Sequence, residues 1–222
     1  MTESRTDAVP ASAWAWVAFA LTMATAAVIL HWQGRADIAL PPLAQAIDWQ
    51  PGLARSEPWR AWTAAFVHLS DLHLMANLAG SAVVAAWGAF ARVPARCVVA
   101  WIVAWPLVQF GLSLQPELRH YGGLSGVLHA GVTIVAVHLV CSGSRMQRRV
   151  ATAVLAGTIV KLLSESPWSG PISHPPGWDI PVAPGAHVSG VLVGAIVTAL
   201  TEGIARAAAA LREALGAIDA HD

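Results

Sequence analysis

The stretch Tyr121-Gly122-Gly123-Leu124-Ser125-Gly126 leads directly into an apolar run over 124–141. A second apolar run over 186–207 opens with Ala186-His187. Both runs approach the length with which an α-helix crosses a bilayer, about 20 residues. Glycines on either side of Ser125 leave room for another backbone to approach it closely. If the two runs are neighbouring helices that start on the same side of a membrane, Ser125 and His187 lie at one depth.

Four further apolar runs indicate an all-α, polytopic membrane protein with six spans. Of the 222 residues, 56% are hydrophobic and only 12% are charged, whereas soluble domains carry about 25% charged residues. The 13 basic and 13 acidic residues balance, so no excess of positive charge points to nucleic acid. The lipid bilayer is the expected surrounding. The additional runs cover 13–32, 72–91, 96–114 and 149–165.

These runs divide the chain into a membrane domain over 13–207, an N-terminal tail over 1–12 and a C-terminal tail over 208–222. The first run has the alternative of a signal peptide, but its leader contains acidic residues rather than a basic cluster. Cys97 and Cys141 lie in or beside apolar runs and are expected to be buried thiols. Tryptophans flank most runs, as anchors at the two membrane interfaces do; they are Trp14, Trp16, Trp32, Trp59, Trp62, Trp168 and Trp178.

The arginines predict that both termini are cytoplasmic, because positively charged residues gather on the inner side of a membrane. In this orientation the outer segments carry Arg35, Arg55, Arg60 and Arg119. The inner segments carry twice as many: Arg5, Arg92, Arg96, Arg145, Arg148, Arg149, Arg206 and Arg212. The second, fourth and sixth runs then all start at the outer face, which brings His73, Asn77, Ser125 and His187 to one side.

Ser125 and His187 are the candidate nucleophile and general base of a hydrolase. A serine attacks once a base takes its proton, and a histidine can later donate that proton to a leaving amine. The acidic residue near His187 in sequence is Asp179, in the preceding loop. We therefore expect a dyad rather than a triad, unless a distant partner exists. The glycine-flanked serine alone would equally fit close packing of membrane helices.

An oxyanion site is expected beside Ser125. His73 and Asn77 are four residues apart and share a helix face from which both can donate hydrogen bonds. The backbone N–H of Ser125 lies at a helix N-terminus, which favours an anion. Gly123 and Gly126 leave space there for a substrate carbonyl. A polar contact between helices is the alternative interpretation of His73 and Asn77.

Glycines follow His187 along one face of the predicted helix. Gly190 and Gly194 have the small-xxx-small spacing of tightly packed membrane helices, which would bring the base to the serine. His129 lies one turn after Ser125 on the same face. It would either stack on His187 or be a satisfied buried histidine.

No metal and no cofactor are expected. The chain has no His-Glu-x-x-His motif, and the histidine-rich stretch 68–73 contains no carboxylate except Asp71. Lys161 and Glu165, four residues apart near the end of the fifth run, are interpreted as an internal ion pair; a contact with substrate or with the outer loop is the alternative. Solvated or interfacial positions are expected for His68, His120, His138 and His174. A channel or transporter would spread polar residues across the whole bilayer, whereas here they gather at the outer ends.

Four motifs, taken in order, resemble those of the rhomboid family of intramembrane serine proteases. They are Glu57-Pro58-Trp59-Arg60, His68 with the stretch 73–77, Gly123-Leu124-Ser125-Gly126, and Ala186-His187 with Gly190 and Gly194. The resemblance implies a six-helix bundle with Ser125 as nucleophile and His187 as base. It also implies an oxyanion site from His73, Asn77 and the Ser125 backbone, and a Trp59-Arg60 motif in an outer loop partly embedded in the membrane.

His129 departs from the common rhomboid pattern, which has tyrosine four residues after the nucleophile. The stretch 121–129 is similar to rhombosortases, a bacterial branch thought to process secreted proteins that end in a Gly-Gly motif, an apolar helix and basic residues. This similarity implies a bacterial inner-membrane protein whose site faces the periplasm, and membrane-anchored substrates with glycine-rich cleavage sites. A general bacterial rhomboid protease is one alternative. The other is a non-catalytic, client-binding relative, although such relatives usually lack the serine or the histidine.

Overall fold

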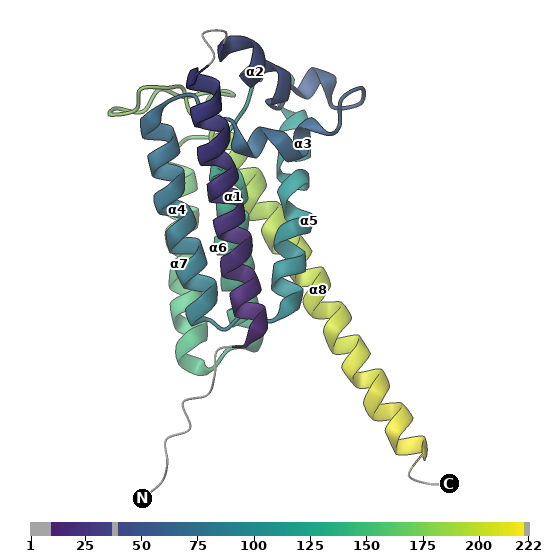
Figure 1. Cartoon of the computed structure of the whole chain (residues 1–222). Coiled ribbons are helices and arrows are strands. Elements are labelled where there is room, and N and C mark those ends of the chain that lie inside the picture. Colours follow the sequence, from purple (N-terminus) through teal and green to yellow (C-terminus); the bar gives the residue numbers. More distant parts are fainter. Residues whose placement is uncertain (1–9, 37–39, 220–222) are drawn as a thin grey trace, which may run out of the picture.

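The computed structural model describes residues 10–36 and 40–219, and throughout these ranges the fold is helical, without strands. The predicted tail over 1–12 therefore lies mostly outside the described residues, as does the end of the predicted C-terminal tail. Six long helices run alternately up and down the bundle (Figure 1). They are α1 (Ala11–Ala36), α4 (Asp71–Phe90), α5 (Ala95–Gly111), α6 (Ser125–Ser142), α7 (Arg145–Ser164) and α8 (Pro184–Asp219).

Each long helix contains most of one predicted apolar run, and α8 continues to Asp219, twelve residues beyond the predicted end at 207. Among the described residues, five helices are long and apolar enough to cross a membrane, namely α1, α4, α5, α6 and α8. Helix α7 is not among them, since it begins with Arg145, Arg148 and Arg149 and also contains Lys161. The prediction of an all-α, polytopic membrane bundle is confirmed, and the sixth span stays a prediction.

Local signals explain where the helices begin. The Ser70 side chain accepts a hydrogen bond from the His73 N–H at the start of α4, and Ser144 forms a capping box with Gln147 at the start of α7. Pro94 immediately precedes α5, and Pro184 is the first residue of α8, positions at which a missing N–H costs nothing. Helices α4, α6 and α8 start at the same end of the bundle, here called the loop end, where α2 and α3 also lie (Figure 1).

Helix α6 is the centre of the bundle and contacts α4, α5, α7 and α8. Trp16 and Trp101 stack with ring centroids 4.2 Å apart in the core beside it. Their indole N–H groups donate to the backbone oxygens of Val84 and Val127, at 2.9 and 2.8 Å. The interfacial position predicted for Trp16 is wrong, because this side chain is fully buried and its polar atom is satisfied inside the bundle.

Helices α6 and α8 pack backbone against backbone. A Cβ atom on Gly190 would overlap the carbonyl oxygen of Gly126, and one on Gly194 would lie 2.8 Å from the oxygen of Ala130. The same is true from the other side, since a Cβ on Gly126 would lie 2.9 Å from the oxygen of Ala186. Small residues thus set the distance between these two helices.

The segment between the first two apolar runs contains two short α-helices, α2 (Leu40–Ile47) and α3 (Arg60–Thr63), and a 3-10 turn over Pro51–Leu53. Arg60 is buried and donates to the backbone oxygens of Gln45 and Asp48, at 2.8 and 3.1 Å, which ties α3 to the end of α2. Trp49 and Tyr121 exchange two backbone hydrogen bonds and join this segment to the chain before α6.

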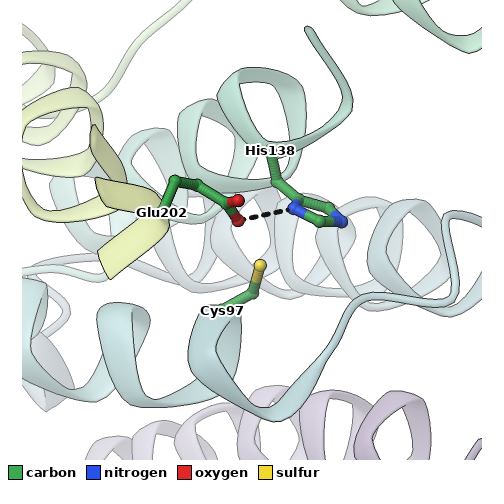
Figure 2. Close-up of side chains that lie close together, drawn as sticks. All are labelled: Cys97, His138 and Glu202. Atoms are coloured by element: carbon green, nitrogen blue, oxygen red, sulfur yellow. Dashed lines mark hydrogen bonds and ion pairs between the residues drawn. The ribbon is translucent and has the colours of Figure 1, made fainter. Parts of the chain in front are cut away.

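A buried polar cluster joins α5, α6 and α8 at the end opposite the loop end (Figure 2). The Glu202 carboxylate accepts from His138 Nδ1 at 2.7 Å and from Arg96 Nε at 2.8 Å. The position predicted for His138 is therefore wrong: the ring is buried and paired. The Cys97 thiol is free and lies beside this pair.

The same cluster has the spacing of a metal site, because Cys97, His138 and Glu202 offer ligand atoms within 4.8 Å of one another. Both oxygens of Glu202 nevertheless accept from the Arg96 guanidinium, at 2.8 and 3.3 Å. Arg96 supplies the positive charge that this buried carboxylate needs. We therefore interpret the cluster as an ionic link between three helices.

Replacing Gly190 by alanine is expected to destabilise the bundle by about 1–3 kcal/mol, because the new methyl group overlaps the backbone of α6. Thermal unfolding in detergent would measure this. The control is Gly203→Ala in the same helix, where nothing lies within 4 Å; it should be neutral or slightly stabilising. Equal melting temperatures for the two variants would contradict the packing described here.

Replacing Glu202 by glutamine removes the charge that Arg96 and His138 share. We expect a loss of roughly 1–3 kcal/mol, less than for a fully buried pair, because the Arg96 side chain is 35% exposed. Unfolding of Glu213→Gln, which changes an exposed residue of the same helix, provides the reference. If both variants have the same free energy of unfolding as the parent protein, the ionic link does not contribute to the stability of the bundle.

Candidate active site

Ser125 and His187 meet at the loop end of the bundle. Ser125 is the first residue of α6, and His187 lies in the first turn of α8. The serine Oγ and the histidine Nε2 are 3.1 Å apart, within hydrogen-bond distance. His187 is buried, with 6% of its surface exposed. The two predicted residues are adjacent because their helices pack closely and start at the same end.

The other ring nitrogen of His187 has an acidic partner that sequence reasoning did not assign to it. Nδ1 lies 2.7 Å from Oε2 of Glu165, the residue that caps the C-terminus of α7. The other carboxylate oxygen accepts from Lys161 Nζ at 2.5 Å, so the predicted ion pair is present. Asp179, the acidic residue near His187 in sequence, instead accepts from Ser70. One sequence signal could have indicated Glu165 as a partner of His187. Glu165 lies at the end of the fifth run, and this end was expected at the same membrane face as His187.

His129 lies flat against the base. The rings of His129 and His187 are stacked, with centroids 4.3 Å apart and planes 19° apart. His129 Nδ1 is 2.7 Å from the backbone oxygen of Ser125, one turn earlier. Because this oxygen can only accept, Nδ1 carries the proton. The histidine therefore fixes one face of the His187 ring while its own polar contact is satisfied within α6.

His73 and Asn77, on α4, face the turn that precedes Ser125. The N–H of Leu69 donates to His73 Nδ1 at 3.4 Å, so the neutral ring carries its proton on Nε2. That Nε2 lies beside Gly123, 2.6 Å from where a Cβ would be, and Asn77 Nδ2 is 3.7 Å from the same point. Asn77 Nδ2 uses one hydrogen on the oxygen of His73 and retains a second. Both side chains present donors on the same side of the turn.

Two groups outside the spanning helices support this arrangement. The rings of His68 and His73 are in tilted contact, with centroids 4.8 Å apart and planes 51° apart, and burial lowers the pKa of His68 to about 3. His68 is therefore neutral and buried, so of the solvated and interfacial positions predicted for it the solvated one is wrong. Burial also raises the pKa of Tyr121, whose hydroxyl donates to the oxygen of Gly123 at 3.4 Å. Neutral side chains thus surround the turn before Ser125 on this side.

A cavity of about 1210 Å³ opens onto Ser125 and His187. It is lined by residues of α4, α6 and α7 and by the loop before α8, including Pro175 and Trp178. His73, Asn77 and His129 also line it. The other predicted site residues lie outside its lining: Gly123 in the turn before Ser125, Gly126, Gly190 and Gly194 between α6 and α8, and Trp59 and Arg60 at the start of α3. Trp59 is 46% exposed, and the Arg60 guanidinium lies 5.0 Å from its ring centroid.

Comparison with known proteins identifies the domain. The sequence profile of the rhomboid domain family matches residues 55–203, which include α4 to α7 and the part of α8 that packs in the bundle. No curated protein sequence matches the chain significantly. Together with five helices that are long and apolar enough to cross a bilayer, the match makes this an integral membrane protein. The chain belongs to the rhomboid family, whose members are intramembrane serine proteases that act on membrane-embedded substrates.

Proposed function

We propose that this protein is an intramembrane serine endopeptidase in which Ser125 is the nucleophile and His187 the general base. The observation that carries the proposal is the 3.1 Å distance between Ser125 Oγ and His187 Nε2 at the edge of a large cavity. Nε2 takes the serine proton as Oγ attacks the substrate carbonyl, and it then protonates the leaving amine. Water hydrolyses the resulting acyl-enzyme ester and releases the serine.

The negative charge that develops on the carbonyl oxygen needs donors on the opposite side of the turn from His187. His73 Nε2, the second hydrogen of Asn77 and the backbone N–H of Ser125 are the candidates. N–H groups in the first turn of a helix have no intrahelical acceptor, so the Ser125 N–H is available there. Each such donor contributes about 10²- to 10³-fold to the rate in hydrolases.

The proposed orientation has both termini in the cytoplasm and the loop end at the periplasmic face of a bacterial inner membrane. In this arrangement the arginine-rich end of α7 and the Glu202 cluster lie at the cytoplasmic side. The membrane domain over 13–207 then contains α7 as its sixth span. The segment 166–185 lies over the cavity from the periplasmic side, and we propose that it gates substrate entry, because several of its residues line the cavity.

The proposed substrates are membrane-anchored proteins with glycine-rich cleavage sites, as for a rhombosortase. From His73 the cavity follows α4 to Val83 and Val84, about three turns deeper. Its deeper part is apolar, with Leu128 and Val132 from α6. A substrate could thus leave an apolar segment in the deep part while its unwound backbone reaches Ser125. Each glycine makes a helix easier to open by about 1 kcal/mol relative to alanine.

A fluorophosphonate probe tests the catalytic assignment, because it forms a bond only with an activated serine. We expect the parent protein to be labelled and to cleave substrate. Ser125→Ala should lose both labelling and cleavage. In His187→Ala the rates of labelling and cleavage should fall by about 10³-fold or more. Cys97→Ser is the control and should behave like the parent, since Cys97 lies in the first turn of α5, which starts at the end of the bundle opposite the loop end (Figure 1). Labelling that survives in Ser125→Ala would contradict the proposal, and no labelling at all would favour a non-catalytic relative.

A pair of reconstituted substrates tests the substrate class. Both have the same transmembrane anchor and basic end, and they differ only in Gly-Gly or Ala-Ala at the cleavage site. Two glycines should favour helix opening by about 2 kcal/mol, so we expect roughly 10- to 30-fold faster cleavage of the Gly-Gly substrate. Gel analysis and mass spectrometry of the products would measure the rates and the cut site. Equal rates would favour a general rhomboid protease over a rhombosortase.

A further inference from the structure

We propose that Glu165 is a positioning residue that, together with Lys161, orients His187 and sets its charge during the reaction. The inference rests on the proposed function, because it concerns how His187 acts as a base. Glu165 caps the C-terminus of α7, whereas Ser125 and His187 belong to α6 and α8. Three helices would therefore supply the groups that act on one proton.

The distances fix the role of each ring nitrogen. His187 Nε2 is 3.1 Å from Ser125 Oγ, and Nδ1 is 2.7 Å from Glu165 Oε2. An ionised carboxylate can only accept, so Nδ1 must carry the proton of the neutral ring. Nε2 is then left with the lone pair that a general base needs to accept the serine proton. A carboxylate at Nδ1 is thus what keeps the imidazole in its productive tautomer.

The carboxylate is itself held in place. Lys161 Nζ donates to Oε1 at 2.5 Å, while Oε2 faces His187, so the two oxygens have separate partners. A simple ion pair along a helix surface would not require the second oxygen to point at a buried ring. The Glu165 side chain is 22% exposed and that of His187 is 7% exposed, so solvent screens their interaction only weakly.

Lys161 also acts directly on His187. Its Nζ lies 3.3 Å from Nδ1, farther than the carboxylate oxygen at 2.7 Å. The ammonium opposes a positive charge on the ring, whereas the carboxylate favours one. The other groups that face the ring are Ser125 and the stacked His129 from α6, and His73 from α4, which interacts with it through space. Among these groups, Glu165 supplies the negative charge and Lys161 the positive one.

These opposite charges give a test that a merely structural role would not pass. The rate constant kcat/KM for a reconstituted transmembrane substrate is measured against pH in Glu165→Gln and in Lys161→Met. Glu165→Gln should lower kcat/KM by about 10- to 10³-fold and move the acid limb of the profile to lower pH, since protonated His187 loses its counter-charge. Lys161→Met should move the same limb to higher pH. Glu165→Asp should recover part of the rate, and Glu213→Gln, at an exposed site on α8, should match the parent.

The outcomes separate this inference from the proposed function. If Ser125→Ala is inactive but Glu165→Gln keeps the parent rate and pH profile, the role of Glu165 is wrong and the serine mechanism stands. If Ser125→Ala still cleaves, the proposed function itself fails. Should Glu165→Gln not fold, Lys161→Met decides: a limb moved to higher pH supports the inference, and an unmoved limb overturns it.

Discussion

The close approach of α6 and α8 determines whether Ser125 and His187 can meet. Both side chains are short, so they can share a hydrogen bond only if their helices run almost in contact. Gly126 and Gly190 allow this, because a Cβ at either position would meet the backbone of the other helix. The 3.1 Å distance between the serine and the histidine is therefore a result of glycine packing along the next turn. In lipid, where apolar surfaces gain little by association, such close packing also holds the helices together.

A second constraint acts on Ser125 through the chain before it. Gly123 has φ +124°, a conformation that residues with a side chain rarely adopt. Its N–H donates to the oxygen of Ala64 at 2.9 Å, immediately after α3, and buried Arg60 fastens α3 to the end of α2. The Trp59-Arg60 motif thus supports the site indirectly, although it does not line the cavity. It holds the segment against which the turn before Ser125 is fixed.

The apolar runs predicted the long helices well, because the length and hydrophobicity of a span are properties of a short stretch of sequence. The proximity of Ser125 and His187 was also predictable from sequence. Successive spanning helices alternate in direction, so the fourth and sixth both start at the same end of the bundle. Contacts between individual side chains at the ends of different helices were harder to predict from sequence. Glu165 is 22 residues from His187 in sequence, and nothing in its neighbourhood distinguishes a partner for a base from half of an ion pair with Lys161. Trp16 and His138 were misplaced for a similar reason: an amphipathic side chain is suited to an interface or to a satisfied core site.

Pairing of charges explains how this bundle can keep ionisable groups among apolar helices. Lys161 offsets Glu165 at the loop end, and Arg96 offsets Glu202 at the other, as the cost of an isolated charge in lipid demands. In the proposed reaction, the proton taken from Ser125 creates a positive charge on His187, whose nearest charged neighbour is the Glu165 carboxylate. The matching negative charge forms on the substrate oxygen, near the donors of His73 and Asn77. Because His187 is buried, fixed partners on both sides stabilise the separated pair more than they would at an aqueous surface.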